Sequence, residues 1–328
     1  MTPNGIPAAA PLWRRALSTG AKLVLSVGLM AFVLSRVPID RVLHLLGAAD
    51  VRWLGAAWLL LVVSNVVGAY QWNRLLQAVG LRMPFLRVVA IYHVGLFFNN
   101  FLPANIGGDI ARVLDASREQ PSRAAAFATV LMDRLIGTVV LGGLAVMATL
   151  PVLNRFHLSM IYALLLAFFL AGVTIMWAVL HPGFLTLVER VLARVGLGWL
   201  KPRLDGVSEH LGLLRGRRGL LAELMVVAIV VQVSRIFVHV LVAVALGLAI
   251  PVAYFFLFVP LLAVIVSLPI SLNGIGVREG AGIVIFGLIG VSRAEAFTLQ
   301  FATYLVALAV SLLGGLVVLA RVAGRRSQ

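Results

Sequence analysis

The feature that most constrains this chain is its series of apolar segments, each long enough to enter or cross a lipid bilayer. The segments run approximately over residues 18–35, 53–73, 84–102, 122–150, 158–181, 219–248, 251–270, 276–291 and 296–320. A helix needs about 20 apolar residues to span the hydrocarbon core. The 328 residues are 62% hydrophobic and 12% charged, whereas soluble domains are about 45–50% apolar and about 25% charged. We therefore predict an all-α polytopic membrane protein and exclude a water-soluble enzyme domain.

Basic residues outnumber acidic ones and lie mostly between the apolar segments. The chain has 27 Lys and Arg residues against 12 Asp and Glu residues, which gives a formal charge of +15. In a soluble protein this excess would suggest a nucleic-acid partner, but basic loops between apolar segments are the topology signals of membrane proteins. We expect no nucleic-acid partner. The absence of cysteine excludes disulfides and thiolate metal sites.

Two basic stretches flank membrane segments. Arg14, Arg15 and Lys22 resemble the start of a signal peptide, but no small-residue cleavage site follows Ser35, so we expect an uncleaved first span. Residues 182–218 interrupt the hydrophobic pattern with seven basic residues. Their apolar residues recur at helical spacing, at Phe184, Leu185, Leu187, Val188, Val191, Leu192 and Val195. This pattern predicts an amphipathic helix on the membrane surface; the alternative is a solvated basic linker.

Ordered matches between the two halves indicate an internal repeat. The matched pairs are residues 79–84 with 246–251, 102–103 with 268–269, 122–127 with 292–297, and 142–144 with 314–316. The offset between the copies is 167 residues at the first match and 172 at the last. Internal repeats are common among transporters. We predict a first membrane repeat over residues 1–150 and a second over 151–328.

The distribution of basic residues predicts how the repeats lie in the membrane. If every apolar segment crossed fully, more basic residues would lie outside than inside, against the positive-inside rule. If residues 84–118 and 251–291 are re-entrant hairpins, 19 basic residues lie inside and 5 outside. Each half then has three spanning helices and one re-entrant broken-helix hairpin, and the odd number of crossings inverts the second copy. We expect a bacterial-type cytoplasmic (inner) membrane, with both termini in the cytoplasm.

The first hairpin is predicted to break at a stretch rich in Pro, Asn and Gly. Pro103 removes a backbone donor and the glycines after it relax the chain, so the helix should end there. Backbone groups freed at membrane depth need polar partners. The polar residues at hand are Asn99, Asn100, Asn105 and Asp109, followed by Arg112. The alternative is an ordinary turn outside the membrane, capped by Asn and Asp.

The second hairpin is predicted to break near Asn273 and to start a new helix near Gly276. A helix N-terminus favours a phosphate or a carboxylate, and Arg278 adds donors that match either group. Glu279 could orient Arg278 or hold a proton. The alternative is a structural Arg–Glu pair without a ligand.

Charges also lie within the predicted spans. Asp133 and Arg134 sit in the 122–150 segment, where each charge costs about 2.5–3.5 kcal/mol on insertion scales. We predict that Arg134 pairs with Asp109 and that Asp133 pairs with Arg278, which would link the two hairpins.

A second group of polar residues lies in the 219–248 segment. Gln232, Arg235 and His239 follow one another at single-turn spacing and predict a polar stripe along a cavity. A metal site is not expected, because no second histidine or carboxylate completes a ligand set nearby. His93 stands alone, and we interpret it as a packed polar residue.

These motifs resemble those of the lysylphosphatidylglycerol synthase transmembrane region family, flippase-like integral membrane proteins. The residues that carry the resemblance are Phe98-Asn99-Asn100-Phe101-Leu102-Pro103, Gly107-Gly108-Asp109, Arg112, Asp133-Arg134 and 271–280, within a likeness that extends from about residue 18 to 320. The resemblance implies movement of a lipid between leaflets, because in two-domain members this region is held to flip a lipid that an attached domain has aminoacylated. This chain ends at Gln328 without that domain, so we do not expect it to aminoacylate lipids, and its substrate cannot be inherited from those members.

The leading hypothesis is a flippase or transporter for a lipid with an anionic, phosphate-bearing head group. The candidate substrate-binding residues are Asn99, Asn100, Asn105, Asp109, Arg112, Asp133, Arg134, Arg235, Asn273, Arg278 and Glu279. We expect no catalytic residues, no metal and no cofactor, and the sequence has no ATP-binding loop. One alternative is a membrane enzyme acting on a lipid head group or lipid-linked sugar, with Asp109, Asp133 and Glu279 as its acids. Another is a scaffold for a separate lipid-modifying enzyme.

Overall fold

The computed structural model describes residues 26–101, 107–119, 122–152, 159–196, 199, 201–267 and 274–326, and these residues form helices and connecting turns without any strand. The helices are α2 (Ile39–Gly47), α3 (Val51–Ala78), α4 (Phe85–Phe101), α5 (Gly107–Glu119), α6 (Arg123–Thr149), η2 (Leu150–Val152), α7 (Ser159–Leu180), α8 (Pro182–Arg194), α9 (Lys201–Gly212), α10 (Arg218–Ala245), α11 (Val252–Ser267), α12 (Val277–Gly287) and α13 (Arg293–Arg326). Residues 26–34 are also helical. The prediction of an all-α chain is confirmed for the described residues.

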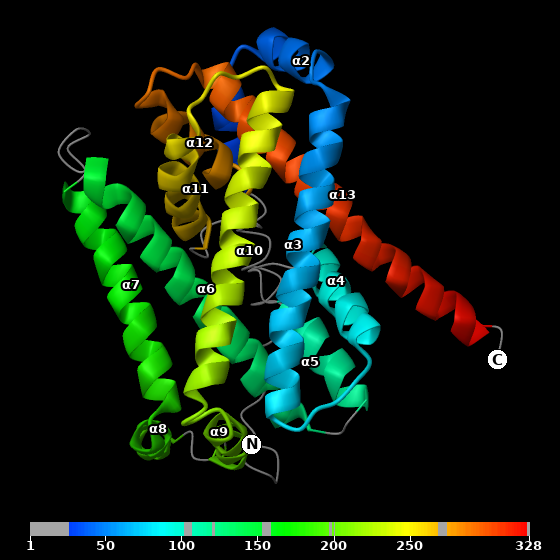
Figure 1. Cartoon of the computed structure of the whole chain (residues 1–328), viewed down its shortest axis with the longest axis vertical. Helices are drawn as coiled ribbons and strands as arrows, with labels where there is room; N and C mark the ends of the chain where they lie inside the picture. The colour runs from blue at the N-terminus through cyan, green and yellow to red at the C-terminus, as the bar shows by residue number, and fades with distance from the viewer. Residues whose placement is uncertain are drawn as a thin grey trace.

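Helices α3, α6, α7, α10 and α13 are each long and apolar enough to cross a membrane. The 28 residues of α3 make a rod of roughly 42 Å, longer than a hydrocarbon core of about 30 Å. These helices run alternately up and down the molecule (Figure 1). The chain is therefore an integral membrane protein. The first predicted span, residues 18–35, lies only partly within the described residues.

Two pairs of shorter helices lie at opposite ends of the bundle (Figure 1). Helices α4 and α5 pack together at the lower end in this view, and α11 and α12 pack together at the upper end. They have 17, 13, 16 and 11 residues, fewer than a perpendicular span needs. The breaks within the pairs, residues 102–106 and 268–273, lie outside the described residues. The re-entrant path and the inversion of the repeat therefore stay predictions.

The matched motifs occupy equivalent local structures in both halves. Gly80 and Gly247 have positive φ angles of 85° and 70°, and the amide after each bonds to a carbonyl five residues earlier at 2.9 Å, as in a Schellman turn. Ser122 and Ser292 each cap the helix that follows, accepting from the amide three residues later at 3.2 and 3.3 Å. These parallels agree with a duplication, and its boundary between residues 150 and 151 stays a prediction.

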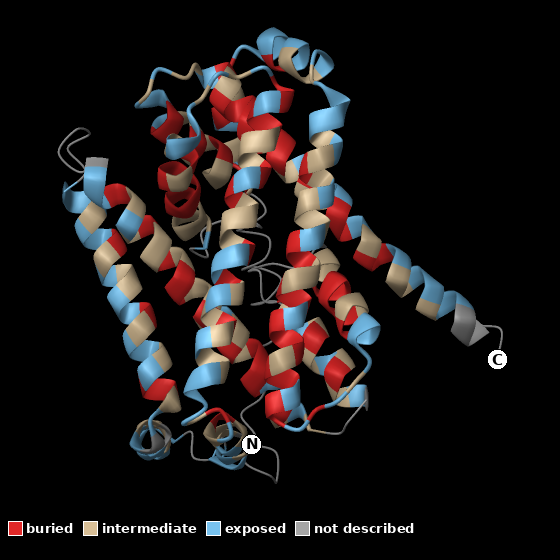
Figure 2. Ribbon diagram, in the orientation of Figure 1, coloured by how far each residue is buried: buried red, intermediate tan, exposed pale blue. Residues whose placement is uncertain are grey.

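The core of the described residues consists of two large apolar clusters along the bundle and a smaller third one around Val37 and Phe297. The lower cluster packs Trp72 of α3 against Met132 and Ile136 of α6, all fully buried. The upper cluster packs Phe255 and Phe258 of α11 against a phenylalanine of α12. Buried residues line the inside of the bundle and exposed ones its outside (Figure 2).

The exposed outer faces are themselves apolar. On α7, Met160 and Trp177 are 77% and 64% exposed. Soluble monomers rarely show contiguous apolar surface of this kind, whereas lipid chains cover it without cost. The outer surface of the bundle therefore fits a bilayer.

The basic segment 182–218 forms two short helices rather than one. Helices α8 and α9 lie across the lower ends of α7 and α10 (Figure 1). Pro182 occupies the first turn of α8, where a missing amide hydrogen costs nothing, and the His181 ring accepts from the Gly183 amide at 3.2 Å. The predicted amphipathic helix is thus confirmed as α8; its position at the membrane surface stays a prediction.

Candidate functional site

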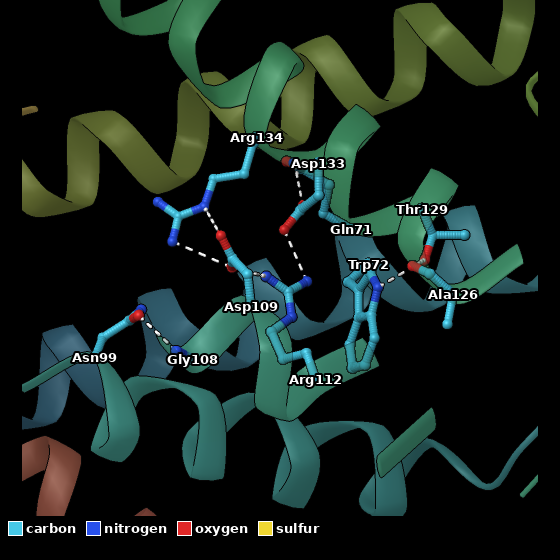
Figure 3. Close-up of polar contacts among 10 residues, drawn as sticks. All are labelled: Gln71, Trp72, Asn99, Gly108, Asp109, Arg112, Ala126, Thr129, Asp133 and Arg134. Carbon is cyan, nitrogen blue, oxygen red and sulfur yellow. Dashed lines mark hydrogen bonds and ion pairs between the residues drawn. The ribbon is translucent and has the colours of Figure 1, made fainter. Parts of the chain in front are cut away.

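An ion pair joins the start of α5 to the middle of α6. The Arg134 guanidinium donates to both oxygens of Asp109, at 2.8 and 3.1 Å (Figure 3). Asp109 lies in the first turn of α5, where the helix dipole favours a carboxylate. The predicted Arg134–Asp109 pair is confirmed.

A second ion pair lies deeper between the same helices. Arg112 donates from Nη2 to Oδ2 of Asp133 at 2.8 Å, and Gln71 donates to the other carboxylate oxygen at 2.8 Å (Figure 3). The predicted Asp133–Arg278 pair is therefore wrong. Arg112 follows Asp109 by almost one helical turn, so the packing of α5 on α6 that brings Arg134 to Asp109 also brings Arg112 to Asp133.

Aromatic rings hold the Arg112 guanidinium in place. Its central carbon lies 4.3 Å from the centre of the Trp72 ring and 4.7 Å from that of Tyr92. Trp72 in turn donates to Thr129 of α6 at 3.1 Å. Only 7% of the Arg112 side chain is exposed, so its charge is compensated by a carboxylate and two rings rather than by water. Arg112, one of the 19 basic residues that the sequence assigned to the inside loops, is therefore an interior residue.

Close backbone contact fixes α4 against the start of α5. The Gly108 amide donates to the side-chain oxygen of Asn99 at 2.8 Å (Figure 3). A Cβ atom on Gly108 would lie 2.0 Å from the Gly95 carbonyl oxygen, so the two helices can approach this closely only with glycine there. Asn99 thus satisfies an amide near the break, as predicted for the polar residues of this stretch.

A cavity of about 430 Å³ lies between the two helix pairs. Its charged and histidine lining consists of Arg134 from α6, Arg235 and His239 from α10, and Arg278 from α12. Its uncharged polar lining comprises Asn65, Asn99, Asn100, Gln232, Ser267, Gln300, Thr303, Tyr304 and Ser311. The predicted polar stripe of Gln232, Arg235 and His239 along a cavity is confirmed.

Glu279 caps its own helix. Its carboxylate accepts from the Gly276 amide at 2.7 Å, and the residue is 1% exposed. The Arg278 guanidinium lies 5.1 Å from the centre of the Tyr304 ring and borders the cavity. One amide at the N-terminus of α12 is thus capped by a carboxylate of the chain, while Arg278 borders the cavity.

The predicted site residues divide into three groups. Asn99, Asn100, Arg134, Arg235 and Arg278 border the cavity, while Asp109, Arg112, Asp133 and Glu279 pair or cap behind it. Asn105 and Asn273 lie outside the described residues, so their place in the site stays a prediction. His93 is buried with its Nδ1 2.9 Å from the Val89 carbonyl oxygen, and its interpretation as a packed residue is confirmed.

Several residues of the cavity were not anticipated from sequence. Asn65 lies buried in α3. In α13, Gln300, Thr303, Tyr304 and Ser311 border the cavity at spacings of three, one and seven residues. This spacing places them on one face of a helix, so a search for polar stripes within the 296–320 segment would have found them.

The fold and the site define a class of protein: an integral membrane protein whose helices border a cavity lined by three arginines and by further polar and apolar side chains. The family model described as lysylphosphatidylglycerol synthase TM region matches residues 21–315. The chain belongs to this family.

Two similar proteins are named UPF0104 membrane proteins. The chain is 28% identical over 145 residues to one from Pyrococcus horikoshii, covering 43% of this chain and 40% of the relative. It is 23% identical over 120 residues to one from Methanocaldococcus jannaschii, covering 36% of each chain. The matched part thus spans well under half the length of either relative. No solved structure matches the chain.

Proposed function

We propose that the protein is a flippase or transporter that moves a lipid with an anionic, phosphate-bearing head group between leaflets. The observation that carries this proposal is a cavity bordered by three arginines inside a bundle with an apolar outer surface. Guanidinium groups match phosphate in geometry and charge. A head group would enter the polar cavity while its hydrocarbon chains stay in the bilayer.

The two short helix pairs support a transporter arrangement. Asn99 and Asn100 reach the cavity from α4, and Ser267 and Arg278 reach it from α11 and α12. We propose that both pairs are re-entrant hairpins from opposite faces, related by an inverted repeat, because transporters of that plan bind substrate where broken helices meet.

Cross-linking tests this arrangement. Cysteines introduced at Asn105 and Asn273, in a chain that has none of its own, should form a disulfide in membranes. Other cysteine pairs, with one residue in 103–109 and one in 271–279, should cross-link less the farther they lie from that contact. A protein that inserts but cross-links at none of these pairs would reject the shared site.

We propose that the lower end of the molecule in Figure 1 faces the cytoplasm. Helices α8 and α9 and the turn before α10 lie at that end, and the segment 182–218 that contains them carries seven basic residues, which the positive-inside rule favours on the cytoplasmic side. Both termini would then be cytoplasmic in an inner membrane. A cysteine at Ser208 of α9 should resist membrane-impermeant thiol reagents in intact cells. Labelling from outside would show that the protein has the opposite orientation.

The direct test of the proposed function is lipid movement in liposomes. Purified protein should speed the exposure of a fluorescent anionic phospholipid to an impermeant quencher, compared with empty liposomes. The Arg217→Gln variant, altered outside the cavity, should keep the normal rate. An unchanged rate with and without the wild-type protein would reject the proposal.

The alternatives have less support from the geometry. The three acids of an enzyme mechanism, Asp109, Asp133 and Glu279, are bonded to Arg134, to Arg112 and to a helix amide, and none of them borders the cavity. A general acid or base must reach the reacting group, so we propose that the protein is not an enzyme. A scaffold role beside a separate lipid-modifying enzyme would not need a charged cavity. Turnover of a lipid by the purified protein would favour the enzyme.

A further inference from the structure

The charges around the cavity do not cancel. The interior charged residues bordering or backing it are Asp109, Arg112, Asp133, Arg134, Arg235, Arg278 and Glu279. Among these described residues four cations face three carboxylates, an excess of one positive charge. The two breaks, residues 102–106 and 268–273, contain no charged residue in the sequence. His239 is counted as neutral, as in the formal charge of the whole chain.

The excess charge belongs to one arginine. Asp109 pairs with Arg134 at 2.8 Å and Asp133 with Arg112 at 2.8 Å, and the Glu279 carboxylate acts electrostatically on its neighbour Arg278. Arg235 borders the cavity, and within the part of the chain that the structure describes no carboxylate lies within ion-pair distance of it. An uncompensated charge inside a membrane bundle is costly. A bound anion would offset that cost.

A second residue also lacks a partner. Gln300 of α13 is 0% exposed and borders the cavity, and neither its amide nitrogen nor its amide oxygen has a hydrogen-bond partner among the described residues. Its side chain packs on Gly282 of α12, where an added Cβ would lie 2.5 Å from the Gln300 Cγ. A buried amide without partners costs free energy. A ligand hydroxyl, which both donates and accepts, would satisfy it.

We infer that the cavity takes a lipid phosphodiester with a single negative charge and an uncharged, hydroxyl-rich head group. This inference rests on the proposed function and names the substrate class of the same cavity. Arg235 binds the phosphodiester oxygen, and Gln300 binds the hydroxyl groups. The loaded cavity is then electrically neutral, which is the charge state with the lowest free-energy cost inside a low-dielectric bilayer. A head group with an amine would leave the loaded cavity with an excess positive charge. A lipid with a second negative charge would leave it with an excess negative charge.

Four lipids separate these features in binding measurements. Phosphatidylglycerol carries one negative charge and two hydroxyls, phosphatidylmethanol the same charge without hydroxyls, phosphatidic acid up to two negative charges, and phosphatidylcholine an added cation. Thermal stabilisation of the purified protein should be largest with phosphatidylglycerol. It should be smaller with phosphatidylmethanol and phosphatidic acid, and near zero with phosphatidylcholine.

Two variants test which residue recognises the phosphodiester charge and which recognises the hydroxyl groups. Arg235→Gln should weaken binding of phosphatidylglycerol and of phosphatidylmethanol by about tenfold or more. Without lipid, it should raise the melting temperature, because it removes an uncompensated charge. Gln300→Met should weaken only phosphatidylglycerol, about two- to tenfold, to the level of phosphatidylmethanol. Arg217→Gln, at the start of α10 and away from the cavity, is the matched control and should change the binding of neither lipid.

A third variant tests the charge balance itself. Asp109→Asn leaves Arg134 at the cavity wall without its carboxylate, so phosphatidic acid should bind better relative to phosphatidylglycerol. Combining Asp109→Asn with Arg235→Gln restores one excess charge and should recover part of the phosphatidylglycerol binding. A double variant that binds no better than Arg235→Gln alone would overturn the charge-balance inference.

The outcomes distinguish this inference from the proposed function. If liposome assays show movement of all four lipids at equal rates, the protein is a transporter and the substrate inference is wrong. If the four lipids bind with the expected preference but none of them moves, the substrate inference stands and the proposed transport is wrong. Equal stabilisation by phosphatidylcholine and phosphatidylglycerol would overturn the inference by itself.

Discussion

Each of the two short helix pairs packs a longer helix against a shorter one, but the two pairs use their charges differently. In the α4–α5 pair, Asp109 and Arg112 are bonded to charged residues of α6, and Arg112 is further covered by two rings. In the α11–α12 pair the helices meet through phenylalanines, Glu279 caps the helix, and Arg278 borders the cavity. The charges of the first pair are therefore engaged in ion pairs that hold α5 against α6, while the second pair presents a cation to the cavity. Similar sequence motifs do not imply similar roles.

The largest effect should come from the second pair. Arg278→Ala should abolish lipid transport in the liposome assay while the protein keeps its helical content, because the cation at the cavity wall is lost. Arg278→Lys should rescue only part of the rate, since a single ammonium cannot bond a phosphate through a planar fork. A normal rate in the alanine variant would make Arg278 a structural residue and remove the contrast between the pairs.

The next effect should come from the first pair and should appear in stability. Arg112→Met leaves Asp133 buried without its cation, which costs about 3–5 kcal/mol for a buried pair. The expected result is a large fall in the melting temperature of the purified protein.

Removing both charges gives the control for that measurement. The double variant Arg112→Met with Asp133→Asn should lose less stability than Arg112→Met alone, because no uncompensated ion remains. If the double variant is the less stable one, the arginine acts through its ring contacts rather than through the ion pair.

The smallest effect should reveal what the two halves share. Ser122→Ala and Ser292→Ala each remove a helix cap and should each lower stability by about 1 kcal/mol. Thermal unfolding of the two variants side by side would measure this. A large loss in one copy with none in the other would show that the repeat preserves sequence without preserving function of the cap.

Much of the fold was predictable because lipid leaves a chain few choices. Backbone groups in hydrocarbon must bond within their own helix, so apolar length alone located α3, α6, α7, α10 and α13. The Arg134–Asp109 pair was also predictable, since each charge needed an interior partner. The partner of Asp133 was not predictable. Once Arg134 pairs with Asp109, the candidate arginines in the sequence are Arg112, Arg235 and Arg278, and only the packing of α5 on α6 selects Arg112.

The sequence by itself determined the helical class, the positions of the long helices, the turns at Gly80 and Gly247, and the polar stripe on α10. These features depend on local propensities and on the exclusion of water from the bilayer, which act along the chain. Only the tertiary structure decided which charges are neutralised and which face the cavity. That division depends on distances of about 3 Å between residues on different helices, and hydrophobic periodicity leaves such distances open.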